Sequence, residues 1–332
     1  MKKTRRAVNC PLLLTLILIF ALTSCNAVED LPESRHDDAV KITHSAPQSS
    51  QNPCFSPDGQ HLIFTRFLDG YNAGASEIVK IKADGSEETI IVPADGANNV
   101  NVPYGSWVGG KICFASDRAG LADEIWIVNE DGGDLRQITT HAEEGGVYYI
   151  EPVFNPQDNT QIVFEYVTGE VDETAVHQIA FLDVETGEVT LLTDGTFDDR
   201  LPSWSNDGSR ILFQRKRYDQ DGGWRVYVAD IQTSPSLSIE ALTMIYFGES
   251  EYTDCSWSFD DAYIVSSSPF DGADMPNIWL FPLDSSEPPI QKTDTATNED
   301  GAPSQAHAGD KIAFESHYGD AEDEPSEIWI VR

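Results

Sequence analysis

A phrase that recurs six times constrains the fold more than any other feature of this chain. It holds a proline, an aromatic anchor, a polar turn and an apolar run, as in "NPCFSPDGQHLIF" from Asn52 and "LPSWSNDGSRILF" from Leu201. Self-similarity at a fixed period indicates a repeat architecture, in which each unit buries its apolar face against its neighbours. The anchors recur every 47 to 53 residues, and Gln305 is the one polar departure among Phe55, Trp107, Phe154, Trp204, Trp257 and Gln305.

Each repeat has the pattern of four short strands. After the Trp204 anchor, the segments "SRILF", "WRVYVADI" and "SIEALT" have the composition and alternation of strands. The intervening turn "SNDG" supplies residues that tolerate the positive φ of a tight hairpin. No segment has a convincing helical period. The sequence therefore predicts an all-β fold, a six-bladed β-propeller of four-stranded blades.

The sixth repeat lacks its fourth strand, because the chain ends at "EIWIVR", Glu327 to Arg332. A matching phrase lies at the other end: "AVKITH", Ala39 to His44, is similar to "LRQITTH" in the second repeat. We expect this N-terminal strand to pair beside Glu327–Val331 and complete the last blade. Closing the ring leaves fewer exposed sheet edges. The predicted propeller domain therefore spans 39–332.

The repeat phrase, "P.WSPDG..I.F.S.R.G...IW.V...GG...LT", resembles that of the TolB-like propeller family. The resemblance covers about Ala39 to Arg332 and implies a six-bladed propeller. It says little about the ligand, because the family is broad. Only "NAVEDLPESRHDD" separates Cys25 from the first strand, so we expect no additional N-terminal domain of the kind found before some TolB-like propellers.

Residues 1–25 have the pattern of a lipoprotein signal peptide. A basic start, "MKKTRR", precedes an apolar run, Pro11 to Leu22, which is too short for a membrane-spanning helix of about 20 residues. The run ends in "LTSC", which resembles a bacterial lipobox with Cys25 as the lipidated residue; an ordinary secretory signal is the alternative. Asn26 after the cysteine favours the outer membrane, facing the periplasm or the cell surface. Residues 26–38 are predicted to form a flexible linker.

Charge excludes one class of partner. The chain has a formal net charge of −35, and removing the leader makes it more negative still. Such a surface repels nucleic acid. Cation binding, a cationic partner and a saline habitat remain open as causes of the acidity. A calcium ion or another divalent cation is a weak possibility, because "DQDGG" from Asp219 lacks the remaining ligands of a calcium loop; no other cofactor is expected.

The variable face of the propeller, which carries the long connections after strands two and four, is the expected binding face. Around its central opening we expect seven residues, although side chains there can also simply solvate a channel: Tyr149, Glu151, Asp199, Arg200, Tyr252, Asp254 and Asp300. The fourth repeat concentrates cations, including Arg215 and Arg217. They either bind an anionic group bidentately or pair with acidic neighbours such as Asp198 and Asp199.

Catalytic motifs are scarce. The chain has no G-x-S-x-G nucleophile motif. His44, His141 and His317 are weak metal candidates, suggested by a resemblance to metal-binding TolB-like propellers of the oligogalacturonate lyase type, but their spacing has no metal-ligand signature. Three further cysteines lie in or beside apolar strands and are expected to be buried free thiols: Cys54, Cys113 and Cys255.

Two functional hypotheses follow. The first is a lipid-anchored, extracytoplasmic, non-enzymatic binding or scaffold module, monomeric, which contacts an envelope protein or peptide, or an acidic carbohydrate. The alternative is a carbohydrate-active enzyme, metal-dependent and lyase-like, or a carbohydrate sensor, that uses the same face.

Overall fold

The computed structural model describes twelve stretches of the chain, all within one compact unit, Ser34–Arg332. They are residues 38–96, 100–102, 105–120, 122–140, 146–169, 175–216, 223–232, 237–245, 250–284, 286–307, 309–318 and 324–332. Within them nearly all regular structure is strand, and the one helical element is a single 3-10 turn, Phe270–Gly272. No helix in these stretches meets the requirements of a membrane span.

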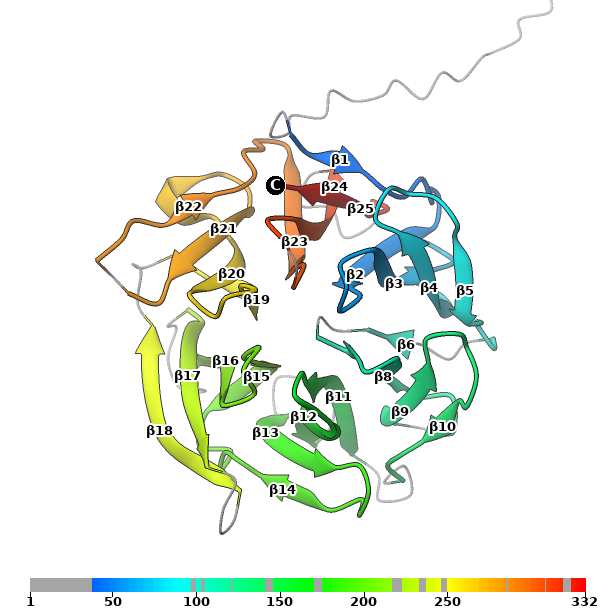
Figure 1. The fold of residues 1–332 in the computed structure, drawn as a ribbon, viewed down its shortest axis with the longest axis vertical. Coiled ribbons are helices and arrows are strands. Elements are labelled where there is room, and N and C mark those ends of the chain that lie inside the picture. Colours follow the sequence, from blue (N-terminus) through cyan, green and yellow to red (C-terminus); the bar gives the residue numbers. More distant parts are fainter. Residues whose placement is uncertain are drawn as a thin grey trace, which may run out of the picture. The chain divides into compact units, whose positions relative to one another are not determined.

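Six antiparallel sheets surround a common centre, as Figure 1 shows, and the first strand of each lies innermost. Blade 1 consists of β2 (Ser49–Phe55), β3 (His61–Phe67), β4 (Ser76–Lys82) and β5 (Thr89–Val92). Blade 2 consists of β6 (Val100–Asn101), β7 (Trp107–Val108), β8 (Lys111–Ser116), β9 (Glu124–Asn129) and β10 (Arg136–Gln137). Blade 3 consists of β11 (Val147–Asn155), β12 (Asp158–Thr168), β13 (Val176–Asp183) and β14 (Val189–Leu191).

Blade 4 consists of β15 (Asp198–Trp204), β16 (Arg210–Lys216), β17 (Arg225–Gln232) and β18 (Ser238–Ile245). Blade 5 consists of β19 (Thr253–Trp257), β20 (Tyr263–Ser268), β21 (Asn277–Pro282) and β22 (Ile290–Gln291). Blade 6 consists of β23 (Asn298–Gln305), β24 (Ile312–Tyr318), β25 (Glu327–Val331) and β1 (Val40–Lys41). Blade 2 divides its first strand into β6 and β7, both paired with β8. The predicted all-β, six-bladed propeller is confirmed.

The hairpins between first and second strands follow from their turn residues. In blade 1 the Ser56 hydroxyl donates to Asp58 Oδ1 at 2.6 Å, and Gly59 takes φ 68°. In blade 4 Ser205 and Asp207 make the same bond at 2.7 Å, with Gly208 at φ 72°. Serine and aspartate fix such turns through their side chains, and glycine adopts the positive φ without strain. These short turns therefore serve the scaffold.

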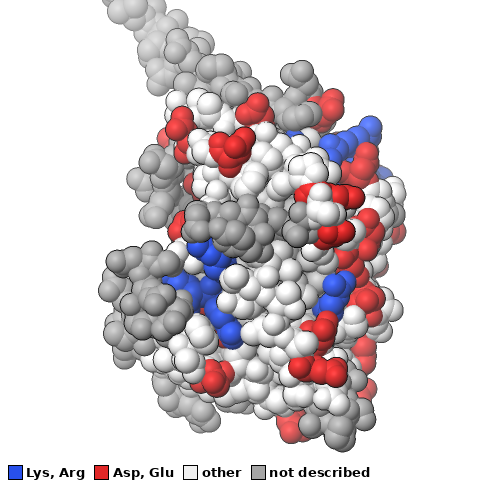
Figure 2. All heavy atoms as spheres, turned by 90° about the vertical axis from the view of Figure 1, so that its left-hand side faces the viewer, with Lys and Arg blue, Asp and Glu red and all other residues white. Residues whose placement is uncertain are grey.

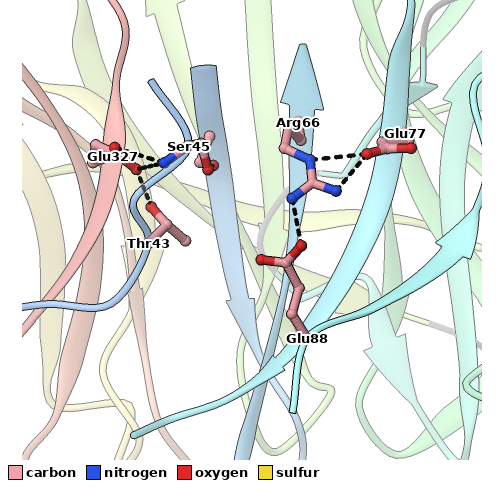
Figure 3. A network of polar contacts seen from close by, with 7 residues as sticks. Thr43, Ser45, Arg66, Glu77, Glu88 and Glu327 are labelled. Carbon is pink, nitrogen blue, oxygen red and sulfur yellow. Dashed lines mark hydrogen bonds and ion pairs between the residues drawn. The ribbon is translucent and has the colours of Figure 1, made fainter. Parts of the chain in front are cut away.

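The ring is closed by the N-terminal strand, as predicted. Val40 pairs with Ile330 and Lys41 with Trp329. Beyond this pairing the Thr43 hydroxyl donates to Glu327 Oε2 at 2.5 Å and accepts from the backbone N–H of Ile328 at 2.9 Å. The Ser45 N–H donates to the same carboxylate (Figure 3). Segments from the two ends of the chain thus complete blade 6 together.

The similarity between "AVKITH" and "LRQITTH" has a structural basis. In blade 2 the Thr139 hydroxyl donates to Glu124 Oε2 at 2.5 Å and accepts from the Ile125 N–H at 2.9 Å, as Thr43 does in blade 6. Blade 1 is fastened differently, by Arg66, which binds both Glu77 and Glu88 (Figure 3). The repeated threonine therefore secures the outer strand of a blade.

The core lies between blades rather than within one sheet. Six apolar clusters each combine residues of two neighbouring blades; Ile63 of blade 1 and Phe114 of blade 2, for example, share one cluster. Cys54, Cys113 and Cys255 belong to these clusters and are buried free thiols, as predicted. Because both faces of a blade are covered, its second and third strands carry almost continuous apolar runs.

Candidate functional site at the mouth of the propeller axis

One irregular position recurs where each first strand approaches the variable face. The pairing of the first and second strands skips there, which is a β-bulge. The residue at the bulge takes a left-handed backbone conformation, with φ between 44° and 53°, in five blades: Asn52, Glu151, Leu201, Asp254 and Ala302. Such strain in non-glycine residues concentrates at functional sites. In these five blades the repeat therefore presents one re-aimed side chain near the axis.

Neighbouring blades are joined at these bulges. The Glu315 carboxylate of β24 accepts from the Asn52 N–H of blade 1 at 2.7 Å. Glu165 of β12 accepts from the Leu201 N–H of blade 4 at 3.2 Å. These contacts satisfy backbone donors that the bulge removes from the strand ladder. They also hold carboxylates close to the axis, where they act on each other and on any ligand.

An axial pocket of about 260 Å³ opens between blades 1, 2 and 3. Its polar lining is two carboxylates, Asp123 and Glu151, and the side chains of three asparagines, while the rest is apolar. The lining residues are Asn52, Phe67, Asn72, Val100, Asn101, Ala115, Asp123, Ile150 and Glu151. Asn72 and Asp123 lie in connections after second strands, so the pocket belongs to the variable face.

The hydrogen bonds in the axial pocket have a direction. Asn52 Nδ2 donates to Asn101 Oδ1 at 2.9 Å, and Asn101 Nδ2 donates to Glu151 Oε1 at 2.7 Å. Each amide group thus donates a hydrogen bond to the next side chain. The series ends on the Glu151 carboxylate, which can only accept hydrogen bonds when it is ionised. Asp123 adds a second carboxylate. The pocket favours a ligand that supplies N–H or O–H donors.

Burial raises the pKa values of three acids near the axis. Burial, reinforced by the charges of Glu165 and Asp254, raises the pKa of Glu151 to about 8. Burial likewise raises the pKa of Glu315 to about 7 and that of Asp123 to about 6. A cationic ligand would favour the ionised carboxylates, so its binding would release protons.

The sequence placed Tyr149 and Tyr252 at the opening, and that placement was wrong. Their side chains are only 3% and 1% exposed. Tyr149 packs against Phe164 in the core between blades 2 and 3, and Tyr252 packs edge-on against Phe281 in the core between blades 4 and 5. Because they lie before the bulge, their side chains are directed between blades. Neither tyrosine offers contact area to a ligand.

Two arginines of blade 4 have acidic partners. Arg200 forms a two-point ion pair with Asp198, at 2.7 and 3.0 Å. Arg215 binds Asp199 in the same way, at 2.6 and 2.9 Å. The interpretation that these arginines pair with neighbouring acids is thus the one that the geometry favours over an open anion site. Arg217 lies outside the described residues.

Two predicted acids lie near the axis with their own partners. Asp254 Oδ2 accepts from the Ala302 N–H at 3.4 Å. Asp300 is 1% exposed, and its backbone carbonyl accepts from the Ser267 hydroxyl at 2.6 Å. Of the predicted opening residues, only Glu151 lines the axial pocket. Glu151 is therefore the residue on which the candidate site rests.

The remaining predicted site residues are the three histidines and the lipidated cysteine. His44 is exposed, whereas His317 is buried and lies 3.7 Å from Glu299. His141 and Cys25 lie outside the described residues. Across the stretches that the structure describes, no three potential metal-binding side chains come together.

The sequence analysis missed Asn52, Asn101, Asp123, Glu165 and Glu315. A signal existed for three of them. Asn52 precedes the proline of the repeat phrase, as Glu151 does, and the two glutamates interrupt the apolar runs "VFEYV" and "AFESH". Asn101 could not be aligned with the other repeats, because blade 2 has two additional residues before the Trp107 anchor. Nothing in the local sequence distinguishes Asp123 from other loop acids.

Comparisons with known proteins agree with this architecture. TolB from Acinetobacter baumannii has a similar structure, with a TM-score of 0.60 and 15% identity over 83% of this chain, which spans 64% of that protein. An oligogalacturonate lyase in complex with manganese gives a TM-score of 0.55 and 14% identity, covering 90% of this chain and 95% of the lyase. An acylaminoacyl peptidase from Pyrococcus horikoshii gives 0.53 and 11%, covering 86% and 51%. At such identities the likeness concerns the fold.

No curated protein matches the sequence significantly. The family model for the TolB beta propeller domain, however, matches residues 36–233, which is more than half of the chain. This match includes the N-terminal strand, the first three blades and the first three strands of blade 4. The chain belongs to the TolB beta propeller domain family.

Proposed function

We propose that this protein is a non-enzymatic binding module of the bacterial cell envelope, anchored by a lipid on Cys25. Its ligand is a protein or peptide segment that enters the axial pocket from the variable face. The leader with its lipobox-like end supports export and anchoring. The family membership and the likeness to TolB support an envelope setting.

The observation that carries the proposal is the directed series from Asn52 through Asn101 to Glu151. It ends on a carboxylate whose pKa lies near 8, because the site is buried and other acids are close. A ligand ammonium group would supply both a donor and the missing positive charge. Arg200 and Arg215 are held by Asp198 and Asp199, which leaves the acidic pocket as the better-supported contact.

The carbohydrate-active alternative has less support. The likeness to oligogalacturonate lyase is a likeness of fold at 14% identity. Of the histidine candidates within the described stretches, His44 is exposed and His317 is buried. Neither lines the axial pocket.

Affinity capture tests the proposal. The tagged full-length chain, solubilised in mild detergent, is used to capture components of envelope fractions. Glu151→Gln should reduce the amount of captured partner at least tenfold. Glu185→Gln is the matched control, because Glu185 is an exposed glutamate of the same blade on the short-turn face. Equal capture by the parent and Glu151→Gln would refute binding at the axial pocket.

A further inference from the structure

The outer strand of blade 4 differs from its five counterparts. β18 is eight residues long, whereas β1, β5, β10, β14 and β22 have only two to four residues. It pairs with β17 alone, and in the described part of the chain no strand lies along its other edge. A long free edge carries a row of backbone donors and acceptors suited to another strand.

The regular part of this edge is the segment Ala241–Ile245. A bulge precedes it, because Asp230 pairs with Ala241 while Ile231 pairs with Ile239, which leaves Glu240 as the additional residue. Within Ala241–Ile245 two large apolar side chains, Leu242 and Met244, are 39% and 47% exposed. Residues two apart in a strand share a face, so they form one apolar stripe. No other outer strand exposes two such side chains within the described stretches.

The side of the molecule that carries β18 has few charged side chains over part of its surface. Figure 2 views the side on which Figure 1 draws β18, and its lower half has a broad area without charged side chains. Basic side chains border this area on one edge, and both basic and acidic ones border it on the other. In a chain with a net charge of −35, two copies repel each other over most approaches. This side is where a second copy meets little repulsion.

We propose that the Ala241–Ile245 edge is a dimer interface, at which a second copy adds its own β18 antiparallel to the first. The segment is self-complementary about Thr243. A two-fold axis there pairs Thr243 with its symmetry mate, Leu242 with Met244 and Ala241 with Ile245. Opposite residues of antiparallel strands point to the same face, and threonine pairs and apolar pairs stabilise such sheets. The two blades become one eight-stranded sheet.

A second copy fits this edge better than an unrelated peptide. Closed oligomers use the same patch on both subunits, which requires self-complementarity, and "ALTMI" has it. Its one flanking charge, Glu240, lies at the bulge and outside the paired segment. The proposed dimer is the alternative to the monomer expected from the sequence, and it leaves the axial pockets of both copies open.

Site-directed cross-linking tests the interface in the full-length chain, in mild detergent. Thr243→Cys places a thiol on the two-fold axis. Thr89→Cys is the matched control, since Thr89 is an exposed threonine on the outer strand of blade 1. Cys54, Cys113 and Cys255 are buried, and the parent chain corrects for the remaining cysteines. With a short bismaleimide, Thr243→Cys should give at least fivefold more cross-linked dimer than Thr89→Cys.

Light scattering gives a second readout that needs no cysteine. The parent should have twice the mass of one processed chain, after subtraction of the bound detergent. Leu242→Glu should halve that mass and abolish the cross-link of Thr243→Cys, while the circular dichroism spectrum stays that of the folded parent, because Leu242 is 39% exposed in the single chain. Equal cross-linking at positions 243 and 89, a single-chain mass for the parent, or a dimer that survives Leu242→Glu would each overturn the proposal. Cross-linking of Thr243→Cys to a different protein would overturn it too.

Discussion

Replacing Glu151 with glutamine should remove part of the pH dependence of folding stability. The pKa of Glu151 is about 8 in the folded protein, against an ordinary value of 4.5. Between these pH values the folded state holds a proton that the unfolded chain releases. The free energy of unfolding therefore falls as pH rises from about 4.5 to 8. Below that window both states are protonated, so the residue contributes nothing. Glutamine carries no such proton and keeps an oxygen for the Asn101 bond.

The size of this effect follows from the pKa displacement. At about 1.4 kcal/mol for each pH unit, a rise from 4.5 to about 8 corresponds to at most about 5 kcal/mol. Glu151 is half-buried at an open pocket, so water screens its charge, and we expect about 2 kcal/mol. Glu315 and Asp123 have raised pKa values as well. The parent and the variant must therefore be compared at each pH.

Urea unfolding at pH 5, 7 and 9 measures the difference. The variant should be more stable than the parent by about 2 kcal/mol at pH 9, by less at pH 7, and by a few tenths of a kcal/mol at most at pH 5. Glu185→Gln, an exposed substitution in a turn of the same blade, should follow the parent throughout. Curves for Glu151→Gln and the parent that stay parallel over the whole range would show that Glu151 ionises normally, and would refute the electrostatic account of the axial pocket.

Three other predictions concern the anchor, the ring closure and blade 4. Cys25→Ser should abolish lipid labelling of the protein; labelling that persists would place the lipid elsewhere. Thr43→Val should lower the free energy of unfolding by about 1–3 kcal/mol, because it removes one hydrogen bond to the Glu327 carboxylate and the acceptor of the Ile328 N–H; chemical denaturation measures this, and no change would mean that the hydroxyl does not secure the closure. Arg215→Met should cost about 3–5 kcal/mol, since it leaves Asp199 buried without its cation. Arg200→Met should cost about 1 kcal/mol or less, since Arg200 is more exposed; equal losses for the two arginines would contradict this ranking.

The architecture could be predicted because the sequence phrase that defines one blade recurs six times. A phrase with an anchor, a turn and two apolar runs defines a blade, and the match between Ala39–His44 and the second repeat predicted the closure seen in the pairing of β1 with β25. The matching threonines, Thr43 and Thr139, make equivalent bonds to Glu327 and Glu124. Repetition converts weak local propensities into a strong pattern.

The site was less predictable because side-chain direction depends on one backbone irregularity. The bulge at Glu151 places a left-handed residue between two regular stretches of β11, so alternation does not continue through it. Tyr149, before the bulge, is buried between blades, whereas Glu151 lines the pocket. Pairing of Arg200 and Arg215 with neighbouring acids was one of the stated alternatives. The two-point geometry of these ion pairs depends on the folded backbone and could not be predicted from the sequence.

Photo-cross-linking from the rim of the axial pocket tests the central claim most directly. Asn72 is exposed and lines the pocket, so a photoreactive residue at position 72 lies within reach of a bound ligand. In intact cells it should give one discrete adduct, which disappears when Glu151→Gln is added. The same photoreactive residue at position 185, on the short-turn face, should give none. A discrete adduct at position 185 with none at position 72 would contradict ligand binding through the axial pocket.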